Sequence, residues 1–303
     1  TSIVGVWNAR PAVADTAWLA TPVDNSWGNA ANWSAGVPSS GDVAQFTTST
    51  ITTTYHNGDR SVKGIYYSGA ADFVQEAGGG VIYVFDSGIL ADGGNQTFNT
   101  QIRPRSDVMP VVNNGTGLVD FNGEFLIHRV SAGTTTVTFS GTGDFEVRRF
   151  SRRTTSFNMD LVKEGSGSLR ILGVYPNAAG SNTGYVTGTT TVNGGTLYLQ
   201  GANIGLSTVG PGTLTINAGG TVTAESHNVF GAGNLANIPA IVINGGSVNP
   251  AQYNWMKSLE MTGGTVNAGP GGGDGLYMAG TPTVTTHANA TSASRPLPVA
   301  CCT

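Results

Sequence analysis

The sequence predicts an all-β protein, folded as a right-handed parallel β-helix that is closed at its N-terminal end by a tryptophan-rich cap. Two observations support this prediction: a strand–turn–strand phrase recurs along the chain, and no long stretch has the apolar period of a helix. The glycine content points the same way, because 45 of the 303 residues are glycine and glycine weakens helices.

The recurring phrase is clearest in residues 189–199, which read TTTVNGGTLYL. Val192 precedes a turn, and Leu197 and Leu199 follow it, at the alternate spacing that places side chains on one face of a strand. Asparagine and glycine form the turn, because glycine accepts positive φ and asparagine tolerates it. Variants of the phrase surround the paired glycines that begin at positions 194, 219, 245 and 263.

A repeat of this length is typical of a solenoid, since one unit cannot bury its own apolar face but stacked units can. An antiparallel sandwich of hairpins is the alternative, because short alternating strands also suit it. In a solenoid, the apolar residues of each phrase face inward, among them Val192, Leu214, Ile243 and Val266. The asparagines before comparable turns are expected to stack as a ladder of side-chain amides: Asn193, Asn217 and Asn244.

The composition limits the partners and the location of the protein. Only 11% of the residues are charged, against about 25% in an average protein. Such a polar but uncharged surface suits extracellular life, and we expect a secreted protein at the cell surface. The net charge of −4 is too weak to steer nucleic acid, and no apolar run is long enough to span a membrane.

Residues 1–46 are expected to form an N-terminal arm and cap. Four of the five tryptophans fall in this part of the chain: Trp7, Trp18, Trp27 and Trp33. The first turn of a solenoid exposes an open core and unpaired backbone groups, which bulky side chains can cover. Stacking of sugars on exposed rings is the functional alternative.

Residues 47–278 are expected to form the turns of the helix. The strand pattern predicts strands at residues 65–67, 81–85, 118–121, 125–127, 137–139 and 145–147. Proline, asparagine and glycine gather in three stretches that predict loops: residues 174–188, 225–240 and 269–275.

Residues 279–303 lose the pattern and are expected to form a final strand, an arm that docks on a neighbouring chain, or a tail. Cys301 and Cys302 are adjacent at the end and cannot form a disulfide framework; a vicinal disulfide, a bridge to another chain and free thiols stay open. With Trp7 and Trp18, they are the candidate assembly contacts.

One phrase near the start of the chain is formed by Trp27, Asn32, Trp33, Pro38, Gly41, Asp42, Ala44 and Phe46. This phrase resembles the opening of the autotransporter-associated β-strand repeat proteins, which are large secreted or surface proteins of bacteria. Later phrases match in the same order at residues 61–65, 88–99, 163–173 and 189–199. The resemblance covers roughly residues 27–270 and implies a right-handed β-helix in a passenger or surface region, without any catalytic residue.

No enzyme, metal site or cofactor is predicted. The four histidines are scattered singly, and no phosphate loop or nucleophile elbow is present. The competing enzymatic reading is a β-helix polysaccharide lyase or glycosidase, for which Asp144 and Glu146 share one strand face.

Two further sets of residues are candidate sites. The only charge cluster, RRFSRR, carries four arginines that could contact a polyanion such as a polysaccharide, or another subunit: Arg148, Arg149, Arg152 and Arg153. Four asparagines match the N-glycosylation sequon: Asn32, Asn95, Asn114 and Asn289.

The function predicted from these features is that of a secreted, non-catalytic structural protein that assembles head to tail into a homo-oligomer or filament. One end of the solenoid is expected to be plugged and the other open, and a contact between unlike ends propagates into fibres. A carbohydrate-binding adhesin is the alternative.

Overall fold

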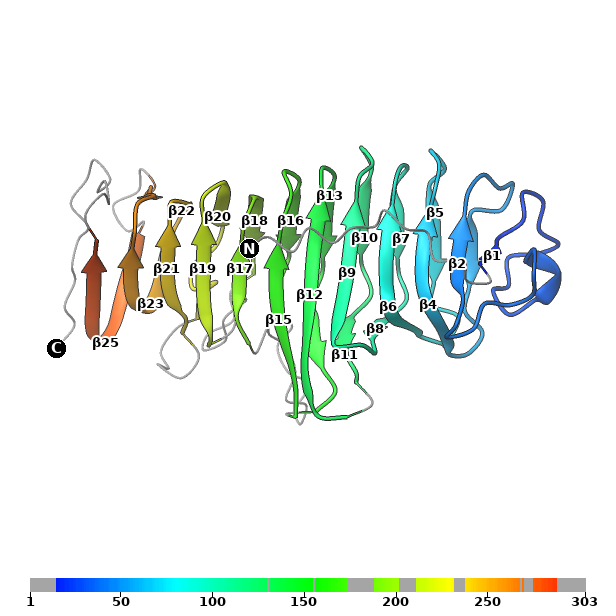
Figure 1. Ribbon diagram of the computed structural model, residues 1–303, viewed down its shortest axis with the longest axis horizontal. Helices are drawn as coiled ribbons and strands as arrows, with labels where there is room; N and C mark the ends of the chain where they lie inside the picture. Colours follow the sequence, from blue (N-terminus) through cyan, green and yellow to red (C-terminus); the bar gives the residue numbers. More distant parts are fainter. Residues whose placement is uncertain are drawn as a thin grey trace.

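The chain forms a parallel β-solenoid of about ten turns. The structure is a computed structural model, which describes residues 15–129, 131–154, 156–173, 188–201, 211–231, 238–267, 269 and 275–287. Figure 1 shows the strands side by side along one long axis, with β1 near one end and β25 at the other. Strands from successive turns pair in parallel, which confirms the predicted β-helix over the antiparallel sandwich.

The larger sheet, called the long sheet here, runs the length of the rod. Its strands pair in the order β1 (Thr16–Ala17), β2 (Val43–Phe46), β4 (Arg60–Tyr67), β6 (Ile82–Ala91), β9 (Val108–Asn113), β12 (Gly133–Gly141), β15 (Phe157–Lys163), β17 (Thr190–Val192), β19 (Thr213–Asn217), β21 (Ala240–Asn244), β23 (Tyr253–Met261) and β25 (Gly275–Thr286). Three short strands leave this path and are called the branch: β8 (Ile102–Pro104), β11 (Phe125–Ile127) and β14 (Phe150–Arg152).

The second sheet supplies the opposite wall of the core. Its strands pair in the order β3 (Thr53–Tyr55), β5 (Phe73–Glu76), β7 (Gln96–Phe98), β10 (Leu118–Phe121), β13 (Asp144–Val147), β16 (Ser168–Ile171), β18 (Gly195–Leu199), β20 (Gly220–Ala224), β22 (Ser247–Pro250) and β24 (Thr265–Val266). All six strands predicted within residues 47–160 lie in or overlap these elements. The one helical segment among the described residues is the 3₁₀ turn η1 (Ala30–Asn32).

The core consists of aliphatic columns that pass from turn to turn. In the second sheet, Leu197 pairs with Val222, which pairs with Val248, and all three are fully buried. The four residues expected to face inward are no more than 4% exposed: Val192, Leu214, Ile243 and Val266. Because each column is continuous, every turn covers the apolar face of the turn before it.

Aromatic rings fill the N-terminal end of the core, as the predicted cap requires. Trp18, Trp27 and Trp33 are 1%, 0% and 4% exposed, and Phe46 packs between them and the next turn. The indole of Trp33 donates a hydrogen bond to the Trp27 carbonyl, and that of Trp18 donates to the Ile51 carbonyl. These buried rings cannot stack on sugars, so the alternative reading of these three tryptophans is wrong.

The expected asparagine ladder is present on the outside of the turns. The Asn217 amide donates to Oδ1 of Asn193 at 2.7 Å, and the Asn244 amide donates to Oδ1 of Asn217 at 3.2 Å. Asn193 in turn donates to the Glu164 carboxylate at 3.3 Å. The ladder therefore links four successive turns outside the backbone hydrogen bonds.

One column of the long sheet contains a lysine. Lys163 lies in register between Phe139 and Val192 and is fully buried. Its ammonium donates to the carbonyls of Glu164, Gly165 and Gly194 at 2.6, 3.3 and 3.4 Å. Burial lowers the pKa of Lys163 to about 8. The carbonyl contacts satisfy the ammonium, so Lys163 holds a turn together within the core.

Candidate functional site

The four arginines of the RRFSRR cluster lie at the two ends of the short strand β14. Arg148 and Arg149 lie between β13 and β14, where Nε of Arg149 is 3.7 Å from the Glu124 carboxylate. Arg152 ends β14 and Arg153 follows it. The strand therefore divides the cluster into two pairs.

Arg153 instead joins residues from three other turns. We call this group the arginine face: Tyr83, Arg103, Arg105, His128 and Arg153. Tyr83 of β6 is in register with Arg103 of β8, and the other three residues follow β8, β11 and β14 directly. Arg105, His128 and Arg153 are separated by 23 and 25 residues, which is about the length of one turn. This spacing is visible in the sequence, but the RRFSRR cluster alone does not reveal it.

Tyr83 anchors two of the guanidinium groups. Nη1 of Arg103 donates to the Tyr83 hydroxyl at 2.9 Å, and that hydroxyl donates to the Asp59 carboxylate at 3.3 Å. The guanidinium carbon of Arg105 lies 4.1 Å from the centre of the Tyr83 ring. Tyr83 is 9% exposed, so its ring is covered by these cations.

His128 lies between two guanidinium groups. Its Nδ1 is 3.5 Å from Nη1 of Arg103, and its Nε2 contacts Nη1 of Arg153. Burial, followed by the charges of Arg105, Arg153 and Arg103, lowers the pKa of His128 to about 4, so the ring is neutral at pH 7. A neutral imidazole has one donor and one acceptor nitrogen, whereas guanidinium only donates. Only one of the two contacts can therefore be a hydrogen bond.

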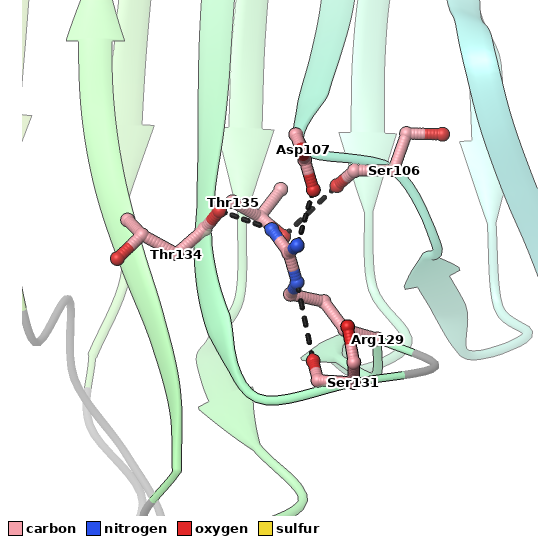
Figure 2. A network of polar contacts seen from close by, with 6 residues as sticks. All are labelled: Ser106, Asp107, Arg129, Ser131, Thr134 and Thr135. Carbon is pink, nitrogen blue, oxygen red and sulfur yellow. Dashed lines mark hydrogen bonds and ion pairs between the residues drawn. The ribbon is translucent and has the colours of Figure 1, made fainter.

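Figure 2 shows the clamp that holds this face in place. The Arg129 guanidinium pairs with the Asp107 carboxylate and donates to the carbonyls of Thr134 and, at 3.4 Å, Ser131. The Thr135 hydroxyl donates to the Ser106 carbonyl at 3.0 Å. Because Arg129 follows His128 and Ser106 follows Arg105, these contacts fix neighbouring turns of the arginine face relative to one another.

A second network borders the face. The Glu124 carboxylate accepts from the Gln101 amide and the Ser151 hydroxyl, and Gln101 accepts from Nε of Arg103. The Glu124 carboxylate thus neutralises the positive charge of Arg149 on its side of the branch. In the part of the chain that the structure describes, no carboxylate lies within ion-pair distance of Arg103, Arg105 or Arg153.

The other predicted sites are placed as follows. Trp18 is buried within the cap, so its ring is not at the surface of the subunit. Trp7, Cys301, Cys302 and Asn289 lie outside the described residues.

The sequons differ in accessibility. Asn32 is fully buried; its amide donates to Asp24 and to the Ser26 carbonyl, so a glycan has no room there. Asn95 and Asn114 are exposed, although Asn95 bonds to Asp72 and Asn114 to Asp92.

Asp144 and Glu146, the acidic pair expected on one strand face, lie beside a third acid, Asp120, in the adjacent turn. Asp144 and Glu146 both point outward from β13, and Glu146 is in register with Asp120 of β10. Burial, and then the charge of Glu146, raises the pKa of Asp120 to about 6. Among the described residues, no group of three or more metal-ligating side chains could hold a metal ion, and no helix is long and apolar enough to cross a membrane.

Asp120→Asn is expected to stabilise the protein at neutral pH and to lose this effect in acid. A pKa that is higher in the folded state than the ordinary 3.8 favours the folded state at low pH, and this contribution is lost as pH rises through 6. Urea unfolding at pH 4, 5, 6 and 7 checks this. A difference between Asp120→Asn and wild type that is independent of pH, or largest at pH 4, would contradict it.

Comparison with protein-family models, with curated proteins and with solved structures finds no match to this chain. The structure supports one part of the resemblance to the autotransporter-associated β-strand repeat proteins, namely the β-solenoid fold.

Proposed function

We propose that this chain is a secreted, non-catalytic structural protein whose copies join head to tail into an extracellular filament or surface layer. The observation that carries the proposal is the difference between the two ends of the rod. The N-terminal end is closed by side chains and short strands. The C-terminal end is the long strand β25, in which a valine in register with a buried residue is exposed.

The N-terminal edges are short and covered. Strand β1, at the edge of the long sheet, has two residues. At the edge of the second sheet, the Tyr55 amide donates to the Asn25 carbonyl, and the Trp27 amide donates to the Tyr55 carbonyl. The chain therefore shields its first turn from other strands.

The C-terminal edge is different. Strand β25 has 12 residues and is the last strand of the long sheet in the described part of the chain. Val284 is in register with Leu259, which is 1% exposed, yet Val284 is 52% exposed. Thr283, Thr285 and Thr286 are exposed beside it. An exposed edge strand of this length is a template for pairing with another chain.

Pairing between such an edge and a different part of the next copy is a heterologous contact, which forms filaments when it does not close into a ring. Because the capped end is shielded, the segment that meets β25 is proposed to be the N-terminal arm, residues 1–14. Its apolar residues, two of them adjacent on each side of Gly5, are strand formers that suit an added strand: Ile3, Val4, Val6 and Trp7.

Val284→Lys is expected to abolish polymers while leaving the monomer folded, because a lysine at an edge opposes strand addition. Val108→Lys is the matched control, since Val108 is 56% exposed in the middle of the rod. Negative-stain microscopy and sedimentation measure the polymers, and circular dichroism checks the fold. Filaments that survive both Val284→Lys and deletion of residues 1–14 would refute the proposal, as would a wild-type protein that stays monomeric at high concentration.

A further inference from the structure

The arginine face brings together more positive charge and more hydrogen-bond donors than its own residues can satisfy. We propose that it binds the sulfate or carboxylate groups of an extended acidic polysaccharide. The proposal concerns the side of the rod and does not depend on assembly through its ends.

The first argument is charge. Arg103 contacts two rings, those of Tyr83 and His128, while Arg105 lies on the Tyr83 ring and Arg153 contacts His128. Like charges on neighbouring strands destabilise a sheet. The carboxylates of Asp59 and Glu124 reach Arg103 only through another side chain, Tyr83 and Gln101 respectively. An anion bound between the guanidinium groups would remove this repulsion.

The second argument is the missing acceptor at His128. Both ring nitrogens face guanidinium nitrogens, and one of these contacts sets a donor against a donor. His128 is 6% exposed, so water does not reach it freely. An oxyanion offers several acceptor lone pairs and forms the strong bidentate hydrogen bonds that guanidinium favours.

The third argument is preorganisation. Arg103 is held by Gln101 and Tyr83, Arg105 lies on the Tyr83 ring, and the Arg129 clamp fixes the turns on both sides. Side chains that are already ordered lose little entropy on binding. The donors are therefore set before a ligand arrives.

The fourth argument identifies the class of ligand. Arg105, His128 and Arg153 follow equivalent strands of successive turns, so the two charges of this row, on Arg105 and Arg153, lie two turns or about 9.6 Å apart along the rod, with the neutral His128 between them. A flexible polymer with regularly spaced anionic groups fits such a row. Nucleic acid is a poorer match, because the net charge is −4 and the Tyr83 ring is covered rather than open for base stacking.

The test compares a double variant of the arginine face with a control variant of one arginine that also lies on a tyrosine ring. In Arg105→Gln/Arg153→Gln the arginine face loses two charges. In the control, Arg170→Gln, the guanidinium lies 4.5 Å from the Tyr198 ring on the second sheet. Binding of labelled dextran sulfate and of polygalacturonate is measured at low salt, with neutral dextran, single-stranded DNA and inorganic sulfate as further probes.

Wild type and Arg170→Gln are expected to bind at least one acidic polysaccharide and not neutral dextran. The double variant is expected to bind it at least tenfold more weakly, since it loses the charge-assisted hydrogen bonds of two guanidinium groups. Unfolding curves establish that all variants are folded. Equal binding by the two variants, no binding of either acidic polymer, or a preference for DNA or for inorganic sulfate over both polymers would overturn the proposal.

Discussion

Phe46→Ala is expected to lower the free energy of unfolding by about 3–5 kcal/mol, as for other buried phenylalanines. Phe46 is fully buried, and its ring centre lies 5.1–6.2 Å from five other aromatic rings: Trp18, Trp27, Trp33, Tyr67 and Phe73. It thus joins the cap to the first turns of the solenoid. Its loss leaves a cavity between large rings that cannot collapse readily.

Tyr55→Ala is the matched control, because Tyr55 belongs to the same end of the rod but is 40% exposed. We expect its cost to stay within about 1 kcal/mol. Urea unfolding followed by tryptophan fluorescence measures both variants, since four of the five tryptophans lie in the first 33 residues. Similar losses for Phe46→Ala and Tyr55→Ala would show that the cap does not stabilise the rod.

Gly88→Ala is expected to destabilise the protein by about 2–5 kcal/mol through two effects that add. Gly88 has φ +64°, which costs an L-residue about 1–2 kcal/mol. A Cβ atom there would also lie 1.9 Å from the Pro110 carbonyl oxygen of the next turn. The strands β6 and β9 would have to separate where Ile89 pairs with Val111.

Gly36→Ala separates the two effects. Gly36 has φ +86°, but a Cβ atom there would meet nothing within 4 Å. We expect its loss to reflect the backbone alone, and thermal or urea unfolding of both variants gives the difference. If Gly88→Ala costs no more than Gly36→Ala, the turns are not packed as closely as described.

The repeat could be predicted because it depends on the spacing of apolar residues and glycines within a short stretch of sequence. Val192 and Leu197 alternate around a glycine turn, and the same spacing recurs one turn later, so both the strands and the inward columns follow from the sequence. The asparagine ladder follows in the same way, because residues at equal positions in successive turns must be neighbours.

The turn-length spacing relates Arg105, His128 and Arg153, but the rest of the arginine face could not be predicted, because it depends on where the strands of the long sheet branch. Strand β6 pairs with β8 through Ile82–Val84 and with β9 through Ile89–Ala91, and this branching creates the arginine face. The sequence marks no such division. The sequence places Arg153 in a local cluster, whereas its contact with His128 comes from the adjacent turn.

Lys163 shows a second limit of the pattern. Lys163 begins the phrase KEGSGSLRILG, and nothing in the phrase indicates that this lysine is fully buried, which is rare for the residue type. The structure accommodates it because three carbonyl oxygens of the turns converge on the ammonium. Such convergence arises from stacking and cannot be read from one repeat.

The shared register of neighbouring turns also makes the length of this rod easy to change during evolution. Residues Thr196–Leu199 pair with Thr221–Ala224, and these pair with Ser247–Pro250, with no offset. Unequal crossing-over between the gene segments for two such turns would remove or duplicate a whole layer while keeping its hydrogen bonds in line. The molecule would then grow or shrink in steps of about 4.8 Å, at constant cross-section.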